Sequence, residues 1–320
     1  MQIDSKIADQ IYDALTKAKN VIIFSHRNPD PDTVGSNLAL RSILEKKQIN
    51  VTSACVDEIP KNLQQVPGFK PFVTKADLHE FDLYISLDAG SLDQVRFPCK
   101  CPKQSKKVPF VNIDHHPSNS KFGTINLVKA SAASATTILY NLFKIWNEPI
   151  TPNIATWLLF GVYFDTGSFM HSNTNDEVYN IASELMAKGA NHQLIIKDLF
   201  KNYTLEKLHL WGKAFSNTRV TDKNVIVSGL REKDYEECHA TKEDLSGLIY
   251  YLGCTQGPNF AALLSEDQDN NVRGSLRTSR DDIDLSEIAR ELGGGGHKKA
   301  SGFTIKGKLD KQTHWSISKD

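Results

Sequence analysis

The sequence has no excess of either charge: Lys and Arg total 38, Asp and Glu also total 38, and the formal net charge is zero. A broad basic surface for long nucleic acids is therefore not indicated, and any anion site must be local or carried by a metal. No apolar run approaches the roughly 18–20 residues of a membrane span. The first residues lack the charged-then-apolar pattern of a signal peptide. We expect a cytoplasmic protein without membrane contact.

Cysteine is scarce, and its spacing is irregular. The five residues are Cys55, Cys99, Cys101, Cys238 and Cys254. An odd number in a chain of this length excludes a regular disulfide framework and suits a reducing compartment. Cys99 and Cys101 are spaced like half of a zinc site, but no second pair follows, so we expect a loop with free thiols.

The pattern of apolar residues predicts an α/β fold. Hydrophobic residues make up 40% of the 320 residues, enough for two domains with sizeable cores. Buried-type strands are expected at residues 21–24, 51–56, 83–87 and 108–113. Helical patterns alternate with them, which is typical of a doubly wound, mainly parallel sheet.

The segment after the first strand contains two prolines, Pro29 and Pro31. We expect them to keep the chain extended until a helix begins at Gly35 and Ser36.

The pattern of apolar residues changes near residue 219, where short strand and helix patterns replace a long helical region. We therefore predict an N-terminal domain at residues 1–200, a helical linker at 201–218 and a smaller C-terminal α/β domain at 219–320, with a cleft between the two domains.

Acidic and imidazole side chains gather where the apolar runs end. They are His26, Asp30, Asp32, Asp88, Asp114, His115, His116 and Asp165. In a parallel sheet the carboxyl ends of the strands meet at one edge, where ligands bind. Carboxylates crowded there repel each other unless a cation is present. The alternatives without a functional role are that Asp30 and Asp32 form turns or helix caps and that the histidines pack without binding a ligand.

Mixed carboxylate and imidazole ligands suit Mn(II), with Mg(II), Co(II) or Zn(II) as alternatives. The donors outnumber the needs of one ion, so we expect two divalent ions. A two-metal cluster supplies a hydroxide near neutral pH and neutralises charge on a phosphate.

In combination, these segments resemble the four motifs of the DHH phosphoesterase superfamily. They are His26 to Ser36, Asp88, Asp114-His115-His116, and Asp165-Thr166-Gly167-Ser168. The C-terminal Gly293 to Phe303 and Gly274 to Arg277 resemble the DHH-associated domain, which binds substrate. The layout is most similar to NrnA-type members, which cleave very short oligoribonucleotides and dephosphorylate 3′-phosphoadenosine 5′-phosphate (pAp).

The resemblance implies a role for each residue. One ion would be held by His26, Asp30 and Asp88, and the second by Asp32, Asp88, His115 and Asp165. Asp88 would bridge the ions, His116 would face the scissile phosphate, and Asp114 would orient an imidazole. The sequence has Pro31 where many members carry glycine, so this position needs no positive φ.

The glycine run offers a second candidate site. The backbone amides of Gly294, Gly295 and Gly296 can form a nest for a phosphate, with His297 beside them. Arg273, Arg277 and Arg280 lie on or beside a strand, and a guanidinium binds phosphate with two hydrogen bonds. The alternative is a flexible linker beside a solvated basic strand. His171 is either a phosphate contact or a surface histidine.

The expected function is a two-metal phosphodiesterase that trims short oligonucleotides (nanoRNA) to 5′-mononucleotides and also acts on pAp. Its expected partners are short single-stranded RNA or DNA and mononucleotides such as pAp, and a homodimer is expected. The alternatives are a linear or cyclic dinucleotide phosphodiesterase and a catalytically inactive nucleotide-binding regulator. The glycine-histidine motif argues against a pyrophosphatase, and the zero net charge argues against a RecJ-type exonuclease on long DNA.

Overall fold

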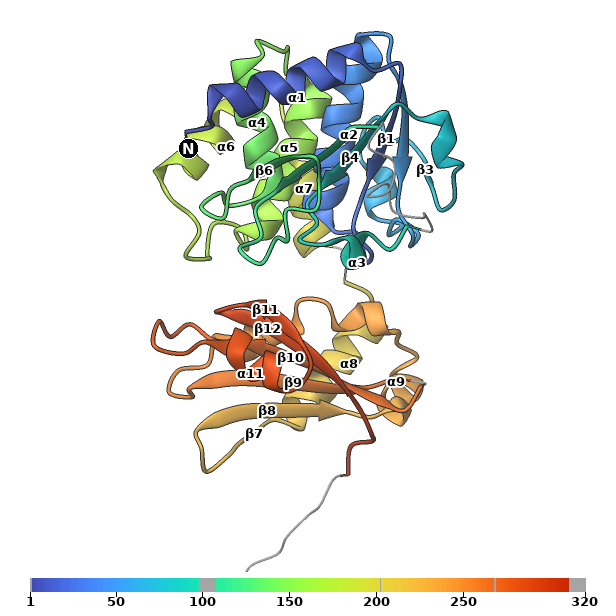
Figure 1. Ribbon diagram of the computed structural model, residues 1–320. Coiled ribbons are helices and arrows are strands. Elements are labelled where there is room, and N and C mark those ends of the chain that lie inside the picture. Colours follow the sequence, from blue (N-terminus) through green and yellow to red (C-terminus); the bar gives the residue numbers. More distant parts are fainter. Residues whose placement is uncertain (1, 98–107, 202, 268, 311–320) are drawn as a thin grey trace, which may run out of the picture. The chain divides into compact units, whose positions relative to one another are not determined.

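The structure is a computed structural model that describes residues 2–97, 108–201, 203–267 and 269–310. The chain divides into two compact units, Met1–Asn202 and Tyr203–Asp320 (Figure 1). The predicted free thiols Cys99 and Cys101 lie outside the described residues. Cys55, Cys238 and Cys254 are free cysteines.

The first unit is built on a parallel sheet of six strands. They are β1 (Asn20–Phe24), β2 (Asn50–Ala54), β3 (Phe72–Val73), β4 (Leu83–Leu87), β5 (Phe110–Asp114) and β6 (Ile125–Val128). Their order is β3-β2-β1-β4-β5-β6, and each neighbouring pair is parallel. The strand order reverses between β1 and β4, which is where doubly wound folds bind ligands. The predicted α/β fold with a mainly parallel sheet is confirmed.

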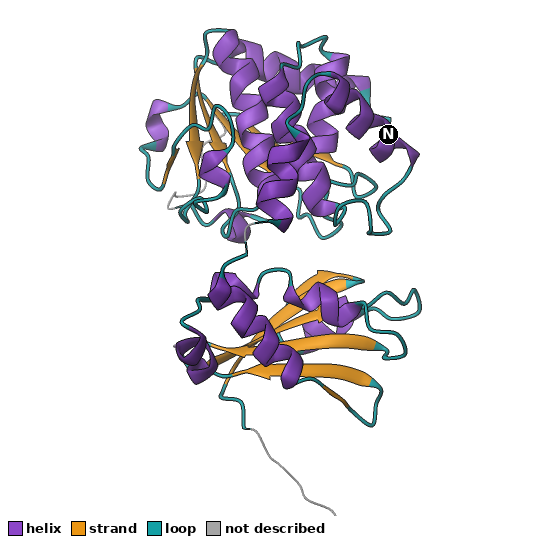
Figure 2. Cartoon of the chain, turned by 180° about the vertical axis from the view of Figure 1, so that it is seen from behind, coloured by secondary structure: helices purple, strands orange, loops and turns teal. Residues whose placement is uncertain are grey.

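Long helices cover one face of this sheet, as the view in Figure 2 shows. They are α1 (Ser5–Lys17), α2 (Pro31–Lys46), α4 (Ala135–Ile145), α5 (Pro152–Asp165), α6 (Asp176–Ala187) and α7 (His192–Phe200). The other face carries the short helix α3 (Leu92–Val95) and packed aromatic rings. Phe24, for example, lies 5.2 Å from Phe97 between ring centroids.

Helix α2 begins at Pro31, four residues before the predicted start at Gly35, so the prediction of an extended segment there was wrong. Proline is tolerated at the first helical position because the amide proton it lacks has no partner inside the helix. Asp30 caps the helix: its Oδ1 accepts hydrogen bonds from the amides of Asp32 and Thr33, at 2.9 and 3.0 Å. The early start places Asp32 inside the helix.

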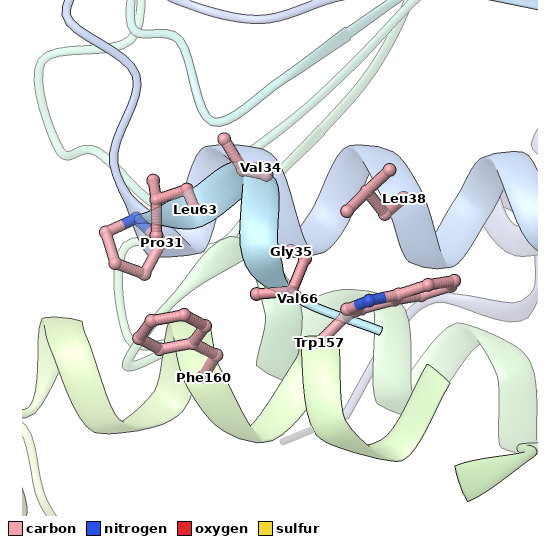
Figure 3. A pocket seen from close by; sticks show the side chains of 8 residues that line it. All are labelled: Pro31, Val34, Gly35, Leu38, Leu63, Val66, Trp157 and Phe160. Carbon is pink, nitrogen blue, oxygen red and sulfur yellow. The ribbon is translucent and has the colours of Figure 1, made fainter. Parts of the chain in front are cut away.

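Helices α2 and α5 cross at a glycine. A Cβ atom on Gly35 would lie 2.4 Å from the carbonyl oxygen of Trp157, so only glycine permits this approach. Figure 3 shows a small apolar pocket beside the crossing, lined by side chains of α2, α5 and the short 3-10 helix at Leu63–Gln65. None of the predicted site residues lines it.

The second unit contains a mixed sheet with the order β11-β12-β10-β9-β8-β7. The strands are β7 (Arg219–Val220), β8 (Val225–Leu230), β9 (Phe260–Glu266), β10 (Asn271–Arg277), β11 (Gly295–His297) and β12 (Ala300–Lys306). The helices are α8 (Leu205–Ser216), α9 (Glu232–Cys238), α10 (Leu248–Gly253) and α11 (Leu285–Glu291). The predicted smaller α/β unit is therefore present.

Helix α8, which falls in the predicted linker, packs in the second unit against α9 and β8. The boundaries at 200 and 218 remain a prediction. Among the described residues, no helix combines the length and apolar character needed to cross a membrane.

Candidate metal centre and substrate-binding residues

The predicted metal ligands of the first unit come together at the carboxyl edge of its sheet. His26 follows β1, Asp88 follows β4, and His115 follows β5, while Asp165 ends α5. Two groups of donor atoms each lie within 4.8 Å of one another: His26, Asp30 and Asp88, and Asp32, His115 and Asp165. The first group is the first ligand set that the family resemblance implied, and the second group is the second set without Asp88. The metal-binding role of each residue remains a proposal.

Asp88 lies at the centre of the cluster, with its two carboxylate oxygens facing different imidazoles. Oδ2 is 3.3 Å from Nε2 of His26, and Oδ1 is 3.4 Å from Nε2 of His115. The hydroxyl of Thr33 donates a hydrogen bond to Oδ2 at 2.5 Å. Asp88 also has a positive φ of 56°. This conformation costs a non-glycine residue of the order of 1–3 kcal/mol and often accompanies function.

Two buried carboxylate oxygens in the cluster accept no hydrogen bond from the described residues. They are Oδ1 of Asp88 and Oδ2 of Asp165. Both face Nε2 of His115, which lies 3.4 Å from the first and 3.2 Å from the second. Buried anionic oxygens without donors are costly unless a cation neutralises them. The donor set therefore fits divalent metal ions.

The charges of the cluster shift the pKa values of its members. Burial and the charges of Asp88 and Asp30 raise the pKa of Asp32 to about 6, against the weaker influence of His115 and Thr136. Burial, with the neighbouring carboxylates of Asp32 and Asp30, raises the pKa of Asp165 well above its ordinary value. Without a cation, the site cannot hold all its carboxylates ionised at low cost.

The pKa values of two imidazoles in the cluster are raised as well, which favours their charged form. Burial lowers the pKa of His115, but the nearby carboxylate of Asp88 and the charge of Asp32 outweigh it and raise the pKa to about 9. Burial also lowers the pKa of His26, but the carboxylates of Asp30 and Asp88 outweigh this effect and raise the pKa well above its ordinary value. A raised pKa favours the protonated form of each ring, whose positive charge offsets the charge of the neighbouring carboxylates.

His116 makes a different set of contacts from its neighbour His115. Its Nδ1 is 2.7 Å from Oδ1 of Asp114 and 3.7 Å from Oδ1 of Asp88. The same histidine also belongs to a third group of potential ligands, with Asp88, Asp114 and His115. The hydrogen bond to Asp114 holds the ring, and the positioning role predicted for that carboxylate remains a proposal.

Asn119 is a site residue that the sequence analysis missed. Its side-chain nitrogen Nδ2 donates hydrogen bonds to Oδ2 of Asp114 at 2.6 Å and to the carbonyl oxygen of Ala89 at 3.0 Å. It therefore joins the loop after β5 to the loop that follows Asp88. No periodicity points to this residue, and only its closeness to the Asp-His-His stretch could have suggested it.

Comparison with known protein families decides the classification. The model of the "DHH family, N-terminal domain" matches residues 20–162, and the "DHHA1 domain" matches residues 222–314. The chain belongs to the DHH family. It therefore combines a DHH domain, which contains all the candidate metal ligands except Asp165, with a DHHA1 domain, as the motif resemblance predicted.

Similar proteins support this classification along the whole chain. A bifunctional oligoribonuclease and PAP phosphatase NrnA of Thermus thermophilus is 28% identical over 90% of this chain and 84% of its own length. The Bacillus subtilis protein of the same name is 25% identical over 89% of both chains. An exopolyphosphatase-related protein from Bacteroides fragilis superposes with a TM-score of 0.88 at 25% identity, covering 96% of this chain and 93% of that one.

In the DHHA1 domain, strand pairing places Arg277 and His297 on one row. Arg277 on β10 lies opposite Ala300 on β12, which in turn lies opposite His297 on β11. Residues directly opposite each other share a face of an antiparallel sheet, with strands about 4.8 Å apart. Arg273 lies on the same face four residues earlier and is exposed.

The glycine run forms strand β11 at the edge of the sheet. Gly295 and Gly296 pair with Gly302 and Ser301 of β12. A Cβ atom on Gly294 would lie 2.1 Å from the carbonyl oxygen of Gly302, so the close strand packing itself requires glycine. Residues 295–297 are exposed, and their predicted role in binding phosphate remains a proposal.

The other basic side chains near β10 are engaged within the same unit. Arg280 pairs with Asp282 at 2.6 Å, and Lys299 pairs with Asp281 at 2.6 Å.

In the first unit, the Nδ1 atom of His171 lies 3.1 Å from the carbonyl oxygen of Asp165. His171 therefore lies beside a candidate metal ligand.

Proposed function

We propose that this member of the DHH family is a two-metal phosphodiesterase that hydrolyses short oligonucleotides to 5′-mononucleotides and also dephosphorylates pAp. The protein is a metal-dependent hydrolase by family. The substrate assignment draws support from NrnA relatives in Thermus thermophilus and Bacillus subtilis, whose names describe an oligoribonuclease and PAP phosphatase. They align with about nine-tenths of this chain.

The observation that carries the proposal is the position of Asp88. Its two oxygens face His26 and His115, which belong to separate groups of donors. One carboxylate thus faces a member of each group, which supports a pair of ions bridged by Asp88. Two ions held there would polarise a phosphate and lower the pKa of water. We propose Mn(II) as the preferred ion, with Mg(II) or Co(II) as substitutes, because the donors mix carboxylate with imidazole.

The protein's own side chains supply orientation and protons. With Nδ1 of His116 bonded to Asp114, the other ring nitrogen is the one proposed to meet a phosphate oxygen. Burial lowers the pKa of His116, but the hydrogen bond with Asp114 outweighs this effect and the pKa is raised. A protonated ring can donate a hydrogen bond to developing negative charge or a proton to the leaving oxygen. Catalysis is therefore assigned to His116, Asp88 and Asp114.

We propose that the DHHA1 domain binds the nucleotide beside the scissile phosphate. Arg277 and His297 share a row of one sheet face, and Arg273 adds a third basic group on that face. Within the described residues, neither Arg273 nor Arg277 is paired with a carboxylate, in contrast to Arg280 and Lys299. Cytoplasmic localisation and a homodimer remain predictions from the sequence.

A substrate panel with Mn(II) tests this function. It contains pAp, the dinucleotide pApA, five-nucleotide and long RNA, cyclic dinucleotides and pyrophosphate. Release of mononucleotides from pApA and the five-mer, with phosphate release from pAp, is the expected result. Preferred cleavage of dinucleotides alone would favour a dinucleotide phosphodiesterase. Tight pAp binding without turnover, in the presence of Mn(II), would identify an inactive regulator instead.

A further inference from the structure

The carboxylate of Asp32 is held by the first turn of α4. Its Oδ2 accepts a hydrogen bond from the amide of Ala135 at 2.6 Å, and its Oδ1 accepts one from the amide of Thr136 at 3.0 Å. The hydroxyl of Thr136 donates a further hydrogen bond to Oδ1 at 2.7 Å. Asp32 and Thr136 are both fully buried, so no water competes for these contacts.

These contacts leave the two oxygens of Asp32 unequal. Each carboxylate oxygen has two lone-pair sites. The two donors of Thr136 occupy both sites of Oδ1, whereas Oδ2 uses one site for Ala135 and retains another. Asp32 also belongs to the donor group with His115 and Asp165. A cation in that group would therefore meet Oδ2, and Asp32 would bind it through one oxygen.

The direction of the hydroxyl hydrogen bonds is fixed by chemistry. An ionised carboxylate only accepts, so the Thr136 hydroxyl must donate to it and can accept from Ser134, whose Oγ lies 2.8 Å away. The Oγ of Ser134 in turn accepts from the amide of Thr137. The hydroxyl of Thr136 thus has one consistent orientation.

Gly161 on α5 provides the space for this arrangement. A Cβ atom there would lie 2.4 Å from Oδ1 of Asp32 and 2.6 Å from both Oγ1 and Cγ2 of Thr136. Even alanine would therefore force Asp32 and Thr136 apart or rotate the carboxylate. Gly161 has no positive φ, so its small size is what the position requires.

We propose that Thr136 is a positioning residue for the second metal position, the one formed by Asp32, His115 and Asp165, and that Gly161 makes this positioning possible. Neither residue touches the ion. The hydroxyl of Thr136 turns Asp32 so that Oδ2 faces the ion, and in this way it sets the affinity of that position. The inference rests on the proposed two-metal site.

The test measures Mn(II) binding directly, by isothermal titration calorimetry of the metal-free full-length chain. Thr136→Val keeps the shape of the side chain but removes the hydroxyl, and Thr136→Ser keeps the hydroxyl. We expect Thr136→Val to weaken one of the two binding events by about 10–100-fold, the usual effect of removing a residue that orients a ligand. Thr136→Ser should restore the affinity, and Gly161→Ala should weaken the same event.

Thr137→Val is the matched control. Thr137 is a buried threonine in the same helical turn, and its hydroxyl donates to the carbonyl oxygen of Ser134 at 2.7 Å. Its removal weakens the cap of α4 and should lower the melting temperature while both ions bind normally. If Thr137→Val weakens the second ion as much as Thr136→Val does, the effect is general loss of helix capping and the inference is wrong.

The remaining outcomes separate this inference from the proposed function. Two ions bound equally well by the wild type and by Thr136→Val would overturn the positioning role and leave the proposed function standing. A wild-type protein that binds a single ion would overturn both. If two ions bind and Thr136→Val weakens one of them, the positioning role holds even if the substrate panel shows no hydrolysis.

Discussion

The imidazole of His116 is hydrogen-bonded to Asp114, with Nδ1 and Oδ1 2.7 Å apart, whereas the neighbouring His115 faces Asp88 and Asp165. Two adjacent histidines are thus held by different carboxylates. His115 lies among the candidate metal ligands, and His116 is held by Asp114, the last residue of β5. This difference supports the proposal that His115 binds metal and His116 acts on substrate.

We predict that His116→Ala keeps two bound metals and the native fold but loses kcat by about 10²–10⁴-fold, the range for a lost general acid or hydrogen-bond donor. His115→Ala should instead lose metal. Metal analysis beside kcat for both variants checks the prediction. It fails if His116→Ala loses an ion or retains near-normal kcat.

Asn119→Ala should lower kcat by about 10–100-fold, because Asp114 loses the donor that holds its second oxygen. Both metals should remain bound. The positioning role predicts that the pH dependence of kcat shifts in Asn119→Ala, since the partner of His116 is altered. A drop in stability with an unchanged pH profile would mean that Asn119 only holds the loop.

Asp88→Ala should abolish activity and weaken both ions, because one oxygen of Asp88 faces each group of donors. Asp93→Ala is a suitable control, because Asp93 is an exposed carboxylate in α3 and belongs to neither group. Titration with Mn(II) and hydrolysis of pApA are the measurements. Substantial turnover by purified Asp88→Ala would contradict the two-metal assignment.

Metal binding should release protons near neutral pH. The pKa of His115 is raised from 6.5 to about 9 in the metal-free protein, so the ring is protonated at pH 7.5 and must lose its proton to bind an ion. Calorimetric titrations with Mn(II) in buffers of different ionisation enthalpy should report at least about one proton released. A heat of binding that does not depend on the buffer contradicts the prediction.

The same shifts predict that the metal-free protein loses stability as pH rises. The raised pKa of His115 contributes stability that is complete below about 6.5 and lost as pH rises through about 9. The pKa of Asp32, raised from 3.8 to about 6, lowers stability as pH rises between those two values, so the further fall above pH 6 comes from His115. The melting temperature in a chelator should therefore fall from pH 6 to 9.5, and Mn(II) should reduce this fall.

Arg277→Ala and His297→Ala should weaken nucleotide binding while Mn(II) binding stays normal. A lost hydrogen bond from a charged group is worth about 1.5–3 kcal/mol, so KM for pApA should rise by about 10–100-fold. Arg280→Ala is the control, since Arg280 is paired with Asp282 and should change KM much less. If metal content falls while KM is unchanged, the proposed division of labour between the two units is wrong.

The sequence alone determined the class of fold and the set of acidic and imidazole side chains that meet at one edge of the sheet. The apolar runs before His26, Asp88 and His115 each predict a buried strand, and parallel strands bring their carboxyl ends to one edge. Local chemistry therefore sufficed to group side chains that lie far apart in the chain. The motif resemblance added the division of these residues between two ions.

Only the tertiary structure decided which neighbours hold those side chains. The contacts of Asp32 with Thr136 and Gly161 join residues more than a hundred positions apart, and they depend on how α2, α4 and α5 pack. The start of α2 at Pro31 was missed because proline breaks a helix interior but fits a first turn. Asn119 was missed because a loop amide shows no periodicity, and its role depends on distances that only folding sets.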